Sequence, residues 1–180
     1  MLSVEQLAGL IRNVPDFPIP GIQFKDITTV LAHPGALGDA VTHLENLLGG
    51  VEFNAVASIE SRGFVFGAVL AARRGIPLVL IRKPGKLPAD TLSQEYSLEY
   101  GTNTVEMHRN AVPEGSRVLI VDDLVATGGS AAAAASLIKR DGSTPVAAAF
   151  MIDLTTLGGA EHLRRTGLPV YSLMEIEVDE

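Results

Sequence analysis

The regular alternation of short apolar runs with helical segments is the feature that most restricts the fold of this chain. Apolar runs typical of buried strands occupy residues 55–59, 78–81, 118–121, 146–152 and 169–173. Segments with a helical pattern or helix-forming composition occupy residues 4–12, 36–48, 64–74, 130–140 and 158–165. Strands that alternate with helices form mostly parallel sheets covered on both faces. The sequence therefore predicts an α/β fold with a mostly parallel central sheet flanked by helices.

Three further segments do not follow this alternation. Residues 14–21 contain three prolines, which predicts an irregular path for the backbone. Residues 82–93 are rich in Pro, Gly and Lys, which predicts a mobile loop. Residues 96–100 and 104–108 are predicted to form a pair of strands joined at Gly101.

The size and composition of the chain limit the class of protein. Its 180 residues suffice for one domain with a single core, and 47% of them are apolar, as in folded globular proteins. No apolar run approaches the roughly 20 residues that span a bilayer, and the N-terminus lacks the features of a secretory signal, so we expect no membrane partner. The absence of cysteine excludes disulfides and cysteine chemistry and fits a cytoplasmic protein. The net charge of −7 argues against a nucleic-acid partner.

The most informative motif is the run VLIVDDLVATGGS at residues 118–130. The apolar strand places Asp122 and Asp123 at its carboxyl end, which is where ligands bind in open α/β sheets. The loop that follows contains Gly128 and Gly129, which allow the backbone to approach a ligand closely. The loop leads into a helix, whose free N–H groups and positive dipole end suit a phosphate monoester. The motif therefore predicts a phosphate-binding loop beside two carboxylates.

These adjacent carboxylates distinguish the motif from the common nucleotide-binding loops. No Lys follows the glycines as it does in a Walker loop, and no G-x-G-x-x-G dinucleotide fingerprint is present. Carboxylates repel phosphate, so they must serve another part of the ligand, and ribose hydroxyls are natural partners because they donate hydrogen bonds. The motif thus predicts a sugar-phosphate site, although a functionless strand, acidic turn and helix cap could share some of these residues.

The thirteen-residue run resembles the phosphoribosyl pyrophosphate (PRPP) signature of the type I phosphoribosyltransferases. The resemblance implies that the acidic pair holds the ribose hydroxyls and that the loop holds the 5′-phosphate. The PRPP-binding residues of this segment are then Asp122, Asp123, Leu124, Val125, Ala126, Thr127, Gly128, Gly129 and Ser130. The resemblance also implies a single domain over residues 1–180, with a small N-terminal hood in about residues 1–34 and a mobile catalytic loop in about residues 82–100.

Three other segments resemble the adenine-specific members of this family. They are residues 16–28 (DFPIPGIQFKDIT), residues 60–64 (ESRGF) together with 80–88 (LIRKPGKLP), and residues 97–101 (SLEYG) continuing to 106–108. Ala89 in place of Gly and Ser130 in place of Thr depart from the family pattern, but neither change removes a needed functional group. The resemblance implies a pentosyltransferase of purine salvage, which converts adenine and PRPP into AMP and pyrophosphate.

The resemblance also implies roles for individual residues outside the motif. Glu99 is expected to assist proton transfer at the adenine ring, with Tyr100 closing the loop. The cations expected to bind PRPP and stabilise the departing pyrophosphate are Arg62, Arg82, Lys83 and Lys86. The residues expected around the base, partly through backbone groups, are Gln23, Phe24, Lys25 and Arg62.

A magnesium ion and a second subunit are also implied. We expect Mg²⁺ to be held mainly by the oxygens of PRPP, with no direct protein ligand and at most water-mediated contact with Asp122 and Asp123. The resemblance implies a homodimer in which Arg82, Lys83 or Lys86 acts at the site of the neighbouring subunit.

Other functions remain compatible with parts of the sequence. A sister enzyme that uses xanthine or guanine would share the PRPP motif, but the segment at residues 16–28 favours adenine. A PRPP-sensing regulator would need a nucleic-acid surface, which the acidic charge does not favour. A sugar-phosphate binding module without chemistry would leave unexplained the cations of the loop at residues 82–93, which we call the basic loop. The alternative is that Lys83, Lys86 and Glu99 are simply solvated residues.

Overall fold

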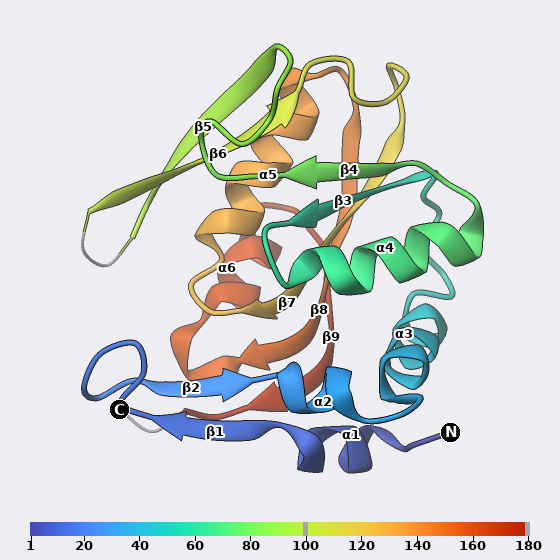
Figure 1. Cartoon of the computed structure of the whole chain (residues 1–180). Coiled ribbons are helices and arrows are strands. Elements are labelled where there is room, and N and C mark those ends of the chain that lie inside the picture. The colour runs from blue at the N-terminus through green and yellow to red at the C-terminus, as the bar shows by residue number, and fades with distance from the viewer. Residues whose placement is uncertain (99–100, 179–180) are drawn as a thin grey trace.

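The centre of the fold is a five-stranded parallel sheet (Figure 1). A computed structural model describes residues 1–98 and 101–178 of the chain. The strands lie in the order β4-β3-β7-β8-β9, and every neighbouring pair is parallel. Their bounds are β3 (Ala55–Ile59), β4 (Leu78–Ile81), β7 (Arg117–Val125), β8 (Thr144–Leu154) and β9 (Val170–Ile176). The predicted α/β architecture is therefore confirmed.

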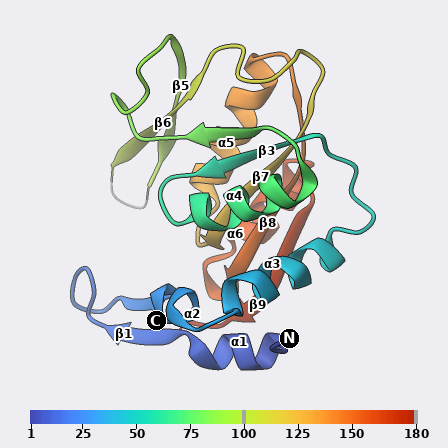
Figure 2. The same ribbon diagram turned by 45° about the vertical axis from the view of Figure 1, so that its right-hand side comes forward.

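Helices cover both faces of this sheet (Figure 1, Figure 2). One face is packed by α5 (Gly129–Arg140) and by α6 (Gly159–Arg165), which follows the 3-10 turn η1 (Thr155–Leu157). The other face is packed by α1 (Val4–Leu10), α2 (Thr28–Ala32), α3 (Ala36–Leu47) and α4 (Gly63–Arg74). Because both faces are covered, all five residues of β3 are buried, which explains why its sequence is an unbroken run of small and apolar residues.

A separate antiparallel hairpin, β5 (Thr91–Ser97) and β6 (Thr102–His108), lies against α5. The hydroxyl of Ser136 donates to the side-chain oxygen of Gln94 at 3.0 Å, and Arg140 donates to the carbonyl of Ser93 at 2.7 Å. The start of this hairpin differs from the prediction, because the loop predicted for residues 82–93 overlaps β5 and the strand predicted to begin at residue 96 begins at Thr91. The polar side chains of β5 hide its strand pattern, since their partners on α5 are distant in sequence.

The N-terminal hood contains two short strands, β1 (Arg12–Pro15) and β2 (Gln23–Asp26), which pair antiparallel. The helix predicted for residues 4–12 ends at Leu10, and the first strand overlaps the segment predicted to be irregular. Asp26 fixes the base of this hood, because it accepts from the backbone and hydroxyl of Thr28 at 2.9 and 2.7 Å and pairs with Arg12. The Thr28 hydroxyl and then the Arg12 guanidinium lower the pKa of Asp26 to about 2.

The connections of the sheet determine where a ligand can bind. From β3 the chain passes through α4 to β4 on one side, whereas from β7 it passes through α5 to β8 on the other. Ligands in open α/β sheets bind outside the carboxyl ends of the strands at such a reversal of strand order. Figure 1 shows the end of β5, the start of β6 and the hood on this same side of the molecule. Among the described residues, no helix has the length and apolar character needed to cross a membrane.

Candidate active site

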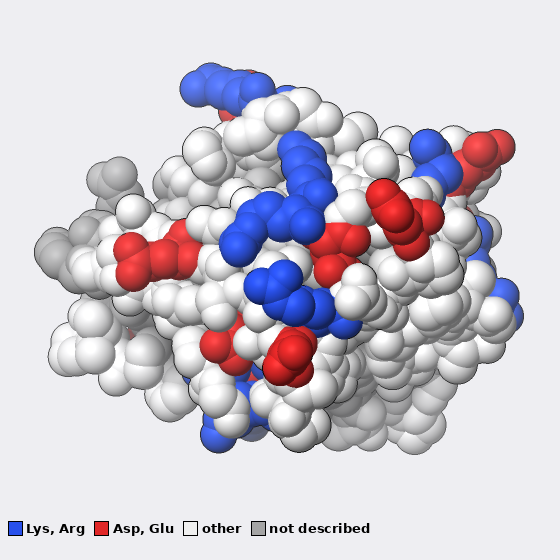
Figure 3. Space-filling model, turned by 90° about the horizontal axis from the view of Figure 1, so that it is seen from above, with Lys and Arg blue, Asp and Glu red and all other residues white. Residues whose placement is uncertain are grey.

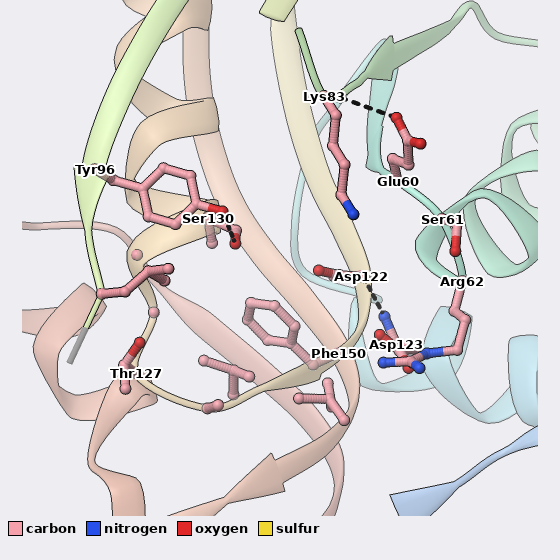
Figure 4. Close-up of a pocket in the computed structure, with 17 residues that line it drawn as sticks. Glu60, Ser61, Arg62, Lys83, Tyr96, Asp122, Asp123, Thr127, Ser130 and Phe150 are labelled. Carbon is pink, nitrogen blue, oxygen red and sulfur yellow. Dashed lines mark hydrogen bonds and ion pairs between the residues drawn. The ribbon is translucent and has the colours of Figure 1, made fainter. Parts of the chain in front are cut away.

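A cavity of about 440 Å³ lies at the carboxyl ends of β3 and β7 (Figure 4). Two segments contribute most of its lining, namely residues 60–62 after β3 and residues 122–131 at the end of β7. The remaining lining residues are Lys83, Tyr96, Leu98 and Phe150. The reversal of strand order therefore coincides with the motif at residues 118–130.

The loop between β7 and α5 presents backbone N–H groups to this cavity. The strand ends at Val125 and the helix begins at Gly129, so residues 126–128 make the turn. The residue before the helix, Gly128, has a left-handed backbone with φ of +86°, and no side chain in the described part of the chain caps the helix start. Because the first N–H groups of a helix have no partner within the helix, they are available to bind an anion here.

The helix α6 holds this loop from behind. The N–H of Gly159 donates to the carbonyl of Ala126 at 3.0 Å. A Cβ atom on Gly159 would lie 2.3 Å from that carbonyl oxygen and 2.7 Å from the nitrogen of Gly128. Backbone therefore touches backbone at this point, and only glycine fits.

The two aspartates of the motif have different environments. The Asp122 carboxylate accepts from the backbone N–H of Asp123 at 2.8 Å, and burial, followed by the charge of Asp123, raises its pKa. Asp123 is 3% exposed and accepts from the Nε of Arg62 at 2.5 Å. The Arg62 guanidinium thus compensates part of the negative charge of the acidic pair beside the phosphate-binding loop.

Gly63 allows α4 to approach this pair. A Cβ atom on Gly63 would lie 2.8 Å from the Oδ1 of Asp122 and 2.9 Å from the carbonyl oxygen of Val121. This close approach places the preceding residue, Arg62, directly opposite Asp123. Position 63 therefore requires glycine, because α4 and the acidic end of β7 are in close contact there.

Arg62 also connects the cavity to the hood. Its guanidinium carbon lies 5.0 Å from the centroid of the Phe24 ring, within range of a cation–π interaction. Along β2 the side chains alternate, and those of Gln23 and Lys25 both bond to Asn13 of β1, at 2.7 and 3.0 Å. Phe24 therefore faces Arg62, whereas a ligand at this strand would meet Gln23 and Lys25 mainly through their backbone.

Glu60 fixes the start of the basic loop. Its carboxylate accepts from the backbone of Lys83 at 2.9 Å and from the Nε of Arg82 at 3.2 Å. Burial opposes ionisation of Glu60, but the Lys83 N–H and the Arg82 guanidinium outweigh it and lower the pKa. As a result, the side chain of Lys83 points into the cavity toward Asp122 (Figure 4).

The other two predicted cations do not line this cavity. Arg82 turns away from it and lies over the ring of Phe64, with its guanidinium carbon 5.8 Å from the ring centroid. Lys86 is exposed, and its carbonyl accepts from Arg82 at 3.3 Å. Seen from above, Lys and Arg side chains gather near the middle of the molecule, beside several acidic side chains (Figure 3).

The structure thus brings together most of the residues that the sequence indicated. Arg62, Lys83 and residues 122–130 line one cavity, and Phe24 lies against Arg62. The predicted catalytic residues Glu99 and Tyr100 lie outside the described residues. The sequence did not indicate six further lining residues, namely Glu60, Ser61, Tyr96, Leu98, Ala131 and Phe150. Ser61 could have been inferred from its place in the segment 60–64, but nothing in the sequence spacing indicates Tyr96.

A metal ion bound by protein alone has no candidate site in the described part of the chain. No group of three or more His, Cys, Asp or Glu side chains is placed to hold one. The acidic pair offers carboxylate oxygens on one side of the cavity only, and Asp123 is already paired with Arg62. This arrangement fits an ion that enters with phosphate ligands of its own.

Comparison with known proteins agrees with this geometry. Residues 27–164 match the family model of the phosphoribosyl transferase domain. Among curated proteins, the adenine phosphoribosyltransferase of Chloroflexus aurantiacus is 54% identical over 97% of this chain and 99% of that protein. The adenine phosphoribosyltransferase of Erythrobacter litoralis is 52% identical over 98% of this chain and 99% of that protein.

Solved structures of adenine phosphoribosyltransferases are also similar to this chain. The crystal structure of adenine phosphoribosyltransferase from Thermoanaerobacter pseudethanolicus superposes with a TM-score of 0.93 at 47% identity, covering 97% of this chain and all of that one. The Saccharomyces cerevisiae enzyme, complexed with an imino-altritol bisphosphate and adenine, gives a TM-score of 0.85 at 37% identity, covering 94% of this chain and 97% of that one.

Proposed function

The chain belongs to the adenine phosphoribosyltransferase family of pentosyltransferases, and on that premise we propose that it joins adenine to the ribose of PRPP, forming AMP and pyrophosphate. One observation carries the proposal more than any other. The acidic pair Asp122–Asp123 and the start of α5, separated by the turn at residues 124–128, line the same cavity as Arg62 and Lys83. A sugar that bears a phosphate at one end and a pyrophosphate at the other matches these three kinds of group.

The proposed position of PRPP follows from the chemistry of the lining. The 5′-phosphate lies at the N–H groups of residues 126–130, where the helix dipole also favours a negative charge. The ribose hydroxyls donate to the carboxylates of Asp122 and Asp123. The pyrophosphate then extends toward Arg62 and Lys83, on the β3 side of the cavity.

The proposed reaction breaks the bond between C1 of the ribose and the pyrophosphate oxygen. The pyrophosphate leaves with the electron pair, while positive charge develops on the sugar and N9 of adenine bonds to C1. Arg62 and Lys83 stabilise the growing charge on the leaving group, which is the electrostatic contribution expected of fixed cations in a cavity. Arg82 and Lys86 are proposed to act from the basic loop, on the site of a neighbouring subunit or after closure over the ligand.

Magnesium is proposed to enter with PRPP. The ion neutralises pyrophosphate charge when it is bound, and this protein offers it at most water-mediated contact with Asp122 and Asp123. Within the described residues, no group of three or more His, Cys, Asp or Glu side chains is placed to hold an ion, which supports this reading.

The base is proposed to lie between Arg62 and the hood. The ring of Phe24 offers an apolar surface beside Arg62, and the backbone of Gln23 and Lys25 offers hydrogen-bonding groups for the amine and ring nitrogens. The proton that adenine loses is proposed to pass to Glu99, with Tyr100 closing the site, as the family resemblance implies.

The setting of the enzyme is part of the same proposal. We propose that it acts in purine salvage in the cytoplasm, which the absence of cysteine fits, and as a homodimer. The dimer rests on the family resemblance given above. Sedimentation of the purified protein tests the dimer.

A panel of bases tests the activity. Purified protein is incubated with PRPP and Mg²⁺ and with adenine, guanine, hypoxanthine or xanthine, and the nucleotides are separated. We expect AMP from adenine, no product from the 6-oxopurines, and loss of AMP when a chelator removes Mg²⁺. Nucleotide formed from a 6-oxopurine would contradict the assignment of adenine as the base. If none of the four bases yields a nucleotide, the proposed enzymatic activity is wrong.

A further inference from the structure

Tyr96 forms one wall of the cavity although no motif of the sequence indicates it. The residue belongs to β5 of the hairpin, far in sequence from the phosphate-binding loop. Its ring contacts the first residue of α5, since a Cβ atom on Gly129 would lie 2.8 Å from the Cδ2 atom of Tyr96 (Figure 4). The ring therefore borders the free N–H groups at the start of the helix.

The hydroxyl of Tyr96 is paired with the last residue of the loop. Its oxygen lies 3.1 Å from the Oγ of Ser130, and either hydroxyl can donate to the other. Within the described residues, neither hydroxyl takes part in any other hydrogen bond. Two hydroxyls carry two protons and their mutual bond uses one, so one proton remains to be donated to a ligand in the cavity.

The position of this remaining proton indicates its acceptor. Both side chains line the cavity together with residues 126–129, which are the backbone groups that suit a phosphate. A hydroxyl that donates to an anion forms a stronger hydrogen bond when a second hydroxyl donates to its oxygen, because each bond polarises the next. The pair is therefore suited to a phosphate monoester rather than to a neutral group.

We propose that Tyr96 is a positioning residue of the phosphate subsite: its O–H donates to the Oγ of Ser130, and the Ser130 hydroxyl donates to the 5′-phosphate. The inference rests on the proposed function, because it takes PRPP as the ligand. Tyr96 does not touch the phosphate in this arrangement. It orients the Ser130 proton and so favours binding of the sugar phosphate without altering the base site.

The contrasting explanation is that Tyr96 only docks the hairpin on α5. The chain offers a matched control for this role, because Ser136 makes a similar contact between α5 and β5, at 3.0 Å from the Gln94 oxygen and outside the cavity lining. Ser136→Ala removes a docking hydrogen bond, whereas Tyr96→Phe keeps the ring on Gly129 and removes only the hydroxyl.

The experiment compares Tyr96→Phe, Ser136→Ala, Ser130→Ala and the double variant Tyr96→Phe/Ser130→Ala. We expect Tyr96→Phe to raise the KM for PRPP about fivefold, as expected for one lost hydrogen bond, and to leave the KM for adenine unchanged. Ser136→Ala should match the wild type. The double variant should match Ser130→Ala, because Tyr96 acts through Ser130.

A second measurement separates this inference from the proposed function. Ribose 5-phosphate, which has the phosphate and the sugar but no leaving group, should raise the Tm of the wild type more than that of Tyr96→Phe. This comparison needs no turnover, so it tests Tyr96 even if no base yields a nucleotide. An unchanged KM for PRPP, an equal Tm increase in both proteins, or independent effects in the double variant would each overturn the inference.

Discussion

Gly159→Ala should disturb the phosphate-binding loop without touching the ligand. The added methyl group would lie 2.3 Å from the carbonyl oxygen of Ala126 and 2.7 Å from the nitrogen of Gly128, whereas ordinary contacts begin near 3.4 Å. Both neighbours are backbone atoms, so no side chain can rotate away. The loop or α6 must therefore move by roughly 1 Å, which is the scale of strain that overpacking causes.

The size of the effect follows from this displacement. A shift of about 1 Å in a positioned group can cost on the order of 100-fold in rate, and overpacking costs about 1–3 kcal/mol of stability. We therefore expect kcat/KM for PRPP to fall about 100-fold. The free energy of unfolding should fall by about 1–3 kcal/mol, so the variant remains folded at assay temperature.

Steady-state kinetics with varied PRPP, together with urea denaturation, would measure both quantities. Gly9→Ala is the control, because a Cβ atom on that glycine of α1 meets nothing within 4 Å. We expect the control to leave PRPP kinetics unchanged. Normal PRPP kinetics in Gly159→Ala would show that α6 does not hold the loop in its binding shape, and would refute the reasoning.

Three further changes probe other parts of the molecule. Asp123→Ala should lower kcat/KM for PRPP by about 10-fold or more, because the ribose loses a charged acceptor, and near-normal kinetics would remove the ribose assignment. Glu99→Gln should lower kcat more than it raises the KM for adenine, and an unchanged kcat would move the proton transfer elsewhere. For Asp26, whose pKa is lowered to about 2 from 3.8, the carboxylate stabilises the fold above pH 4 and loses this effect as the pH falls toward 2. Urea denaturation across that pH range should therefore show a steeper loss of the free energy of unfolding for the wild type than for Asp26→Asn. If the free energies of the two proteins fall in parallel with pH, the role of the Asp26 carboxylate is contradicted.

The central sheet could be predicted because its strands are buried on both faces. Runs such as 55–59 and 118–121 are unbroken apolar segments, and the structure confirms both as strands. The strand β7 continues to Val125, beyond the predicted end, because Asp122 to Val125 still pair with β8 although their composition is mixed. Strand length in the site depends on this pairing, which the local sequence does not show.

The edges of the site could not be predicted in the same way. The hood strands are four residues each, and the prolines near β1 gave a stronger signal than the strand pattern did. Tyr96 and Gly159 matter through contacts with a loop about 30 residues away in sequence, and neither has a local signature. The family resemblance implies that Phe24 lies near the base, but its contact with Arg62 depends on the tertiary structure and has no signature in the local sequence.

The pairing of Arg62 with Asp123 would link the two proposed substrates energetically. The Asp123 carboxylate that holds the Arg62 guanidinium is the one proposed for a ribose hydroxyl, so arrival of PRPP competes for it. Arg62 already lies over the Phe24 ring, so an Arg62 released from Asp123 would keep its contact with the hood, beside the proposed base site. Two ligands that bias one shared residue are coupled, and the coupling is reciprocal: the factor by which PRPP strengthens adenine binding equals the factor by which adenine strengthens PRPP binding. An activated sugar that arrives without a base would then be held less firmly than one that arrives with a base.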